Sequence, residues 1–154
     1  MSATAPIEQR GAMNAVLGFV QWLERIPYSL LAIPLRIAVA TVFWRSGLTK
    51  IPNWDNTVFL FTEEYKVPVL APEVAAYMAT ALELSCPVLL VLGFFTRGAA
   101  LSLLGMTAVI QTFVYPEAWP VHIQWAAMLL VLVARGPGVV SIDRLVHRRF
   151  FSKG

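Results

Sequence analysis

The sequence predicts an all-α integral membrane protein: a four-helix bundle with an N-terminal amphipathic interfacial helix and a short basic C-terminal helix. The first observation is composition. Of 154 residues, 58% are hydrophobic and only 14% are charged, and the mean hydropathy is +0.67, outside the range of ordinary globular domains. The second is that four apolar stretches approach the roughly 20 residues that a helix needs to cross a bilayer. The third is that proline, glycine and aromatic residues separate these stretches.

The N-terminal segment, residues 1–28, is predicted to be a tail followed by a helix in the headgroup layer. Residues 1–12 are small or polar and are expected to be mobile. From Met13 to Ile26 the polar residues recur along one helical face and the apolar residues along the other. Such a short, mixed helix is expected to lie along the membrane surface. Pro27 and Pro34 are expected to separate it from the first span.

The four spans are predicted within residues 29–138. Their expected bounds are about Leu31 to Ile51, Pro72 to Phe95, Arg97 to Val114, and Pro120 to Ala134. Residues 57–72 are too charged to span and are expected to form a short interfacial helix. Gly93 is expected to cap the end of the second span and Thr96 the start of the third. Because the turn between them is so short, these two helices should be antiparallel neighbours.

The C-terminal segment, residues 139–154, is predicted to be a basic cytoplasmic tail whose helix begins after Ser141 as N-cap. Most cations fall on one side of the predicted spans, with Lys66 well out on the other. Those on the first side are Arg10, Arg25, Arg97, Arg135, Arg144, Arg148, Arg149 and Lys153. The positive-inside rule therefore predicts that both termini of this multi-pass membrane protein lie in the cytoplasm.

The first span carries three cations, which require an explanation because a cation at the bilayer centre costs about 2.5–3.5 kcal/mol. Arg36 lies near the cytoplasmic end, where its side chain could snorkel to the headgroups. At about 100° per residue, Lys50 returns to nearly the same face as Arg36, whereas Arg45 points away. Arg45 is deep enough to meet Glu83 of the second span. We expect an Arg45–Glu83 ion pair, with Lys50 as the next candidate partner of Glu83. The pair would either only fix helix packing or form a polar site within the bundle.

Two other residues, His122 and Cys86, could have either a chemical or a purely structural role. His122, near the outer interface, could titrate, relay a proton or hydrogen-bond a quinone carbonyl, or could form a hydrogen bond without further function. Cys86 is the sole cysteine, so it forms no intrachain disulfide, redox pair or thiolate metal cluster. No metal site is predicted. The basic residues form a short tail rather than a recognition stripe, which argues against nucleic-acid binding.

Several of these residues fall into short motifs along the chain. They are Arg36, Ser46-Gly47-Leu48-Thr49-Lys50, Glu83, Leu92-Gly93-Phe94-Phe95-Thr96-Arg97 and Gly136-Pro137-Gly138-Val139-Val140-Ser141-Ile142-Asp143. In this order they resemble the DoxX family over about Leu35 to Leu145. The resemblance implies a small four-helix inner-membrane protein. The family includes a quinone-linked thiosulfate oxidoreductase subunit and membrane partners from oxidative-stress or metal-related gene clusters. Its polar set would correspond to Arg36, Lys50, Glu83 and Arg97, with His122 a looser match.

The first functional hypothesis is a redox-associated membrane subunit that works with a soluble or membrane partner. Glu83, Arg45 and His122 would be its catalytic residues, and Arg36, Lys50 and Arg97 would bind a quinone headgroup or an anionic sulfur substrate. No motif identifies a bound cofactor, and a homo-oligomer stays open. The second hypothesis is a non-enzymatic anchor or assembly factor whose basic tail recruits a cytoplasmic partner or anionic lipid. A small-solute transporter ranks third because it needs an internal repeat, and none is evident.

Overall fold

The computed structural model describes residues 7–150, which are helical throughout their regular parts and contain no strand. The α-helices are α1 (Ile7–Glu24), α2 (Tyr28–Lys50), α3 (Trp54–Leu60), α4 (Pro72–Leu92), α5 (Thr96–Val109), α6 (Trp119–Arg135) and α7 (Ile142–Phe150). Three short turns complete them: the π-helical turns η1 (Phe61–Tyr65) and η2 (Ile110–Val114), and the 3₁₀ turn η3 (Pro116–Ala118). The expected all-α architecture is confirmed.

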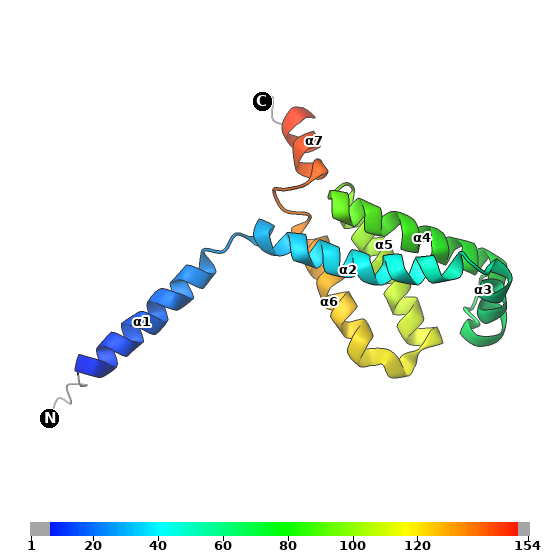
Figure 1. The fold of residues 1–154 in the computed structure, drawn as a ribbon, viewed down its shortest axis with the longest axis horizontal. Coiled ribbons are helices and arrows are strands. Elements are labelled where there is room, and N and C mark those ends of the chain that lie inside the picture. The colour runs from blue at the N-terminus through cyan, green and yellow to red at the C-terminus, as the bar shows by residue number, and fades with distance from the viewer. Residues whose placement is uncertain (1–6, 151–154) are drawn as a thin grey trace.

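Four segments are long and apolar enough to cross a membrane, as predicted. They are Tyr28–Lys50, Pro72–Leu92, Thr96–Val114 and Pro116–Arg135. In Figure 1, α2 and α4 lie along each other, α5 lies against α4 and α6, and α3 folds over the far end of α2 and α4. The first span starts at Tyr28, so the expected break at Pro34 is wrong. Pro27 already stands before the helix, and membrane helices tolerate an internal proline.

Helices α2 and α4 approach each other closely at Gly47. A Cβ atom there would lie 2.8 Å from Leu84 Cδ2 and 3.1 Å from Glu83 Cβ. Small residues at such a crossing allow membrane helices to approach until their backbones nearly touch, which favours packing where no hydrophobic driving force exists. The same interface is filled by buried Val39, Phe43 and Leu90. Gly47 thereby sets the register that brings one face of α2 against Glu83.

Helix α1 begins at Ile7, earlier than the Met13 start predicted from periodicity. It projects from the bundle in Figure 1, and Met13, Phe19 and Trp22 are all exposed. Its placement in the headgroup layer therefore stays a prediction. Residues 1–6 of the expected mobile tail lie outside the described residues.

Arg36 joins the end of α4 to the loop between α6 and α7. Its side chain is only 5% exposed. Nε donates to the carbonyl of Leu90 at 2.7 Å, and Nη2 donates to that of Val91. Nη1 donates to the carbonyls of Pro137 at 3.0 Å and Val140 at 2.7 Å. The alternative in which Arg36 snorkels to the headgroups is wrong, because carbonyls at the end of α4 and in the loop that follows α6 take up its donors.

Asp143 caps the start of α5 from a distant part of the chain. Its two carboxylate oxygens accept the backbone N–H of Phe95 at 2.7 Å and of Thr96 at 3.0 Å. The predicted N-cap role of Thr96 is wrong: Phe95 is the N-cap residue, in a left-handed conformation, and Thr96 is the first helical residue. Gly93 caps α4 with φ +66°, and Ser141 accepts the N–H of Arg144, as predicted.

Gly93 is the position where an added side chain would most disturb the packing of the α4 end against Arg36 and Ser141. A Cβ there would lie 2.6 Å from Ser141 Cβ and 3.1 Å from the Arg36 guanidinium carbon, and the φ is one that only glycine adopts freely. We expect Gly93→Ala to lower the free energy of unfolding in detergent by about 1–3 kcal/mol. Gly105→Ala is the control, since nothing lies within 4 Å of its Cβ position. Equal thermal unfolding midpoints for the two variants would contradict this close packing at Gly93.

Candidate functional site

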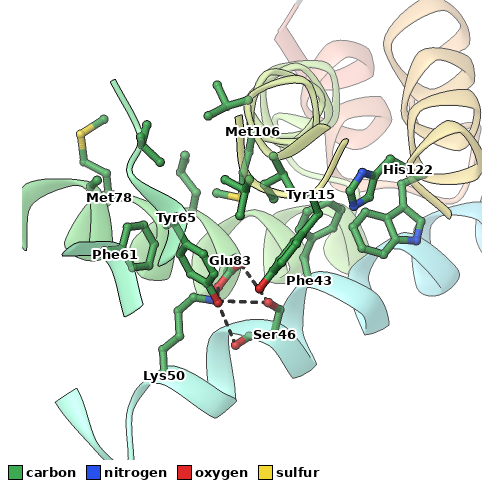
Figure 2. Close-up of a pocket in the computed structure, with 18 of the residues that line it drawn as sticks. Phe43, Ser46, Lys50, Phe61, Tyr65, Met78, Glu83, Met106, Tyr115 and His122 are labelled. Carbon is green, nitrogen blue, oxygen red and sulfur yellow. Dashed lines mark hydrogen bonds and ion pairs between the residues drawn. The ribbon is translucent and has the colours of Figure 1, made fainter. Parts of the chain in front are cut away.

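A cavity of about 350 Å³ lies inside the bundle, at the end that α3 covers. Its walls are mostly aliphatic and aromatic, with Phe43, Met78, Met106 and Trp125 among them. The polar side chains that line it are Ser46, Lys50, Tyr65, Glu83, Tyr115 and His122. An apolar chamber with a few convergent polar groups is the usual form of a small-molecule site (Figure 2).

The polar end of the cavity is organised by an ion pair between Lys50 and Glu83. Lys50 Nζ lies 2.7 Å from Glu83 Oε2, and the two side chains are 13% and 4% exposed. Ser46 Oγ donates to Glu83 Oε1 at 3.0 Å and lies 3.1 Å from Lys50 Nζ. Pairing and hydrogen bonding together offset the cost of burying both charges in the bundle.

Arg45 does not pair with Glu83, so the predicted Arg45–Glu83 ion pair is wrong. Its side chain is exposed. The face of α2 that meets α4 runs through Arg36, Phe43, Gly47 and Lys50, which recur at helical spacing. Arg45 lies off this face, and the close crossing at Gly47 leaves no room to rotate the helix toward it. Lys50, which sequence periodicity had already aligned with Arg36, takes the carboxylate instead.

His122 is buried, and its hydrogen bond selects the tautomer of the neutral ring. Its Nδ1 lies 2.7 Å from Oε1 of Gln111, whose Nε2 donates to the carbonyl of Pro116 at 2.7 Å. Because that carbonyl can only accept, the Gln111 amide must present its oxygen to His122. Nδ1 therefore carries hydrogen, and in the neutral ring Nε2 holds a lone pair that can accept a proton. The ring packs on Trp125 at 5.0 Å between centroids.

Two tyrosines close this end of the bundle: Tyr65 is the last residue of the turn η1, and Tyr115 directly follows the turn η2. Tyr65 and Tyr115 pack edge to face at 5.8 Å, and the Tyr115 hydroxyl donates to Glu64 Oε1. Figure 2 shows both rings extending toward the Ser46, Lys50 and Glu83 side chains. The hydrogen bond to Glu64, together with burial, raises the pKa of Tyr115, which keeps its hydroxyl protonated. π-Helical turns are frequent at functional sites, and both flank this cavity.

The structure divides the predicted site residues into separate groups. Lys50, Glu83 and His122 line one cavity. Arg36 and Arg97 lie at the opposite end of the spans, so their expected part in the Glu83 site has no geometric basis. Sequence reasoning missed further residues that line the cavity or support it: Ser46, Gln111, Tyr65 and Tyr115. Ser46 and Gln111 left a signal: Ser46 precedes Lys50 by one helical turn, and Gln111 is a strongly polar residue within the apolar third span.

The family assignment follows from comparison with known proteins. The DoxX family model matches residues 31–116, more than half of the chain. The chain belongs to the DoxX family. The resemblance inferred from the short motifs is therefore confirmed. With its four apolar helices, this DoxX chain is an integral membrane protein.

Two curated proteins are similar over most of their length. Inner membrane protein YphA of Escherichia coli (strain K12) is 31% identical over 131 residues, which cover 75% of this DoxX chain and 89% of the relative. An uncharacterized protein of Haemophilus influenzae (strain ATCC 51907 / DSM 11121 / KW20 / Rd) is 26% identical over 129 residues, covering 77% and 85%. No solved structure matches. The relatives thus support a DoxX membrane protein without giving it a reaction.

The Lys50–Glu83 pair predicts thermodynamic coupling that Arg45 lacks. In a double-mutant cycle in detergent, Lys50→Gln and Glu83→Gln should each destabilise, and the double variant should lose about 0.5–3 kcal/mol less than their sum. Each single change leaves one buried charge unpaired, whereas the double change removes both. The cycle of Arg45→Gln with Glu83→Gln is the matched control and should be additive. Coupling only in the Arg45 cycle would contradict the structure.

Proposed function

We propose that this DoxX protein is a redox-associated subunit of the inner membrane that binds a quinone headgroup in the cavity of Lys50, Glu83 and His122. The observation that carries the proposal is a buried, hydrogen-bonded ion pair at one end of an apolar cavity of about 350 Å³. Charged groups inside a membrane bundle are costly and usually mark a functional path or site. An apolar ring with polar oxygens matches both the walls and the polar end of this cavity.

The polar groups have complementary roles toward such a ring. The Lys50 ammonium can donate a hydrogen bond to a ring oxygen and stabilise negative charge that develops on it. Glu83 holds Lys50 in place, and the Nε2 atom of His122 can accept or deliver a proton. Reduction of a quinone to a quinol takes two electrons and two protons. The electrons would come from a reduced sulfur donor or a redox partner, as the resemblance to the quinone-linked DoxX subunit implies.

The orientation that we propose puts this cavity in the outer half of the membrane and both termini in the cytoplasm. The cavity lies at the α3 end of the bundle, and the basic α7 lies at the other end (Figure 1). The distribution of cations supports this orientation through the positive-inside rule. The name of the Escherichia coli relative supports the inner membrane.

Cysteine labelling tests the orientation, because Cys86 is buried and should react little. Glu63→Cys and Arg149→Cys each add one exposed thiol, at opposite ends of the bundle. In spheroplasts, a membrane-impermeant maleimide should label Glu63→Cys at once and Arg149→Cys only after the membrane is opened. The reverse order would overturn the orientation.

Quinone binding tests the function directly. Purified protein in nanodiscs should bind decylubiquinone, and Glu83→Gln should weaken the affinity about tenfold or more, because Lys50 loses the carboxylate that orients it. Glu73→Gln is the matched control: it removes an exposed carboxylate from the first turn of the same helix, away from the cavity. Unchanged affinity in Glu83→Gln would move the site elsewhere.

Absence of decylubiquinone binding by the wild-type protein would overturn the redox proposal. The non-enzymatic anchor would then become the preferred function. The exposed basic residues of α7 favour that alternative. Pull-down of cytoplasmic proteins before and after deletion of residues 145–154, which keeps Ser141 and Asp143 in place, would test it.

A further inference from the structure

A second cavity, of about 400 Å³, lies at the opposite end of the bundle from the Lys50–Glu83 pair. It is formed where α2 begins, α5 begins, α6 ends and α7 begins. Three arginines from three different elements line it: Arg97 of α5, Arg135 of α6 and Arg144 of α7. Neither the family match nor the proposed redox site gives this cavity a role.

Arg97 and Arg135 make contacts with neutral groups that do not cancel their positive charge. Arg97 Nη2 lies 3.5 Å from the carbonyl of Ala134, and the Arg135 guanidinium lies 6.0 Å from the centre of the Tyr28 ring. In the described part of the chain, none of these three arginines takes part in an ion pair. Like charges gathered in one cavity repel each other, so this arrangement favours an anion.

Among the described residues that line the cavity, Asp143 is the sole carboxylate, and it already accepts hydrogen bonds. Both of its oxygens accept backbone N–H groups at the start of α5, from Phe95 and Thr96. Its charge offsets about one of the three guanidinium charges, so an excess of positive charge remains. Guanidinium groups bind phosphate oxygens through paired hydrogen bonds. The chemistry of the cavity therefore fits a phosphate group.

The cavity lies at the ends of the spans, where the helices are expected to meet the lipid headgroups. Tyr28 is the first residue of its span, Arg97 is the second of its own, and Arg135 is the last. Beside them the chain exposes apolar side chains: Val139 is 52% exposed, and Leu145 is 66% exposed. A phospholipid in the cavity would also contact these apolar groups with its acyl chains, a contact that a soluble anion cannot make.

We propose that this cavity binds the phosphate-bearing headgroup of an anionic phospholipid, with Arg97, Arg135 and Arg144 as its ligands. The site would fix the ends of three spans and the tail helix to one lipid. It does not depend on the orientation of the protein or on the redox proposal, because the quinone cavity lies at the other end of the spans.

Native mass spectrometry of the full chain in detergent tests this site with two lipids, phosphatidylglycerol and phosphatidylcholine. The wild-type protein should retain phosphatidylglycerol preferentially. Arg97→Gln and Arg135→Gln should each weaken its retention about fivefold, the effect expected for one cation near an anionic headgroup. Arg45→Gln and Arg148→Gln are matched controls, since each removes an exposed arginine outside this cavity and should leave retention unchanged.

Competition with inorganic phosphate distinguishes a bound lipid from a soluble anion. Inorganic phosphate is titrated against bound phosphatidylglycerol. Displacement at equal concentrations, or tight binding of phosphate alone, would overturn the lipid assignment in favour of a soluble anion. Equal retention of the two lipids by the wild-type protein would overturn the site altogether, whether or not the variants fold. Arg97→Lys and Arg135→Lys keep the charge and should retain more phosphatidylglycerol than the glutamine variants.

Discussion

The four-span bundle depends on the hydrogen bonds of one buried guanidinium. Arg36 donates to carbonyls at the end of α4 and in the loop that follows α6, two segments that are far apart in sequence. Carbonyls at a helix end and in a loop need donors from elsewhere in the chain, and arginine has enough donors to bind several at once. One side chain thereby replaces solvent for two chain segments and fixes α2 between them.

Other interactions at the same end of the bundle act together with the hydrogen bonds of Arg36. Asp143 holds the start of α5, and its own N–H donates to the carbonyl of Gly93 at 2.9 Å. Gly93 must be glycine because the Ser141 side chain and the Arg36 guanidinium occupy the space beside it. The motifs by which the chain resembles DoxX proteins are therefore largely structural at this end. This is a reason not to treat every polar residue of a family motif as catalytic.

The opposite end of the bundle is built differently. There the polar groups surround a cavity: Lys50 and Glu83 satisfy each other, and His122 is fixed by Gln111. The placement of Lys50 against α4 follows from the hydrogen bonds of Arg36 at the other end of the bundle. This is because α2 is a continuous helix whose α4-facing side carries both residues. The close crossing at Gly47 keeps the same side of α2 against α4 between these two residues. The hydrogen bonds at one end of α2 thus help to position the Lys50–Glu83 ion pair at the other.

The sequence by itself determined the fold class, the four spans, the glycine cap at Gly93 and the cap at Ser141, because hydropathy and local turn chemistry act over short stretches of chain. Tertiary structure alone decided the partners. It gave Glu83 to Lys50 rather than Arg45, gave the α5 cap to Asp143 rather than Thr96, and buried Arg36. Each choice depends on the rotation of one helix against another and on which distant segment supplies an acceptor. Periodicity within a single helix restricts such pairings to one face, but the packing of the whole bundle selects among them.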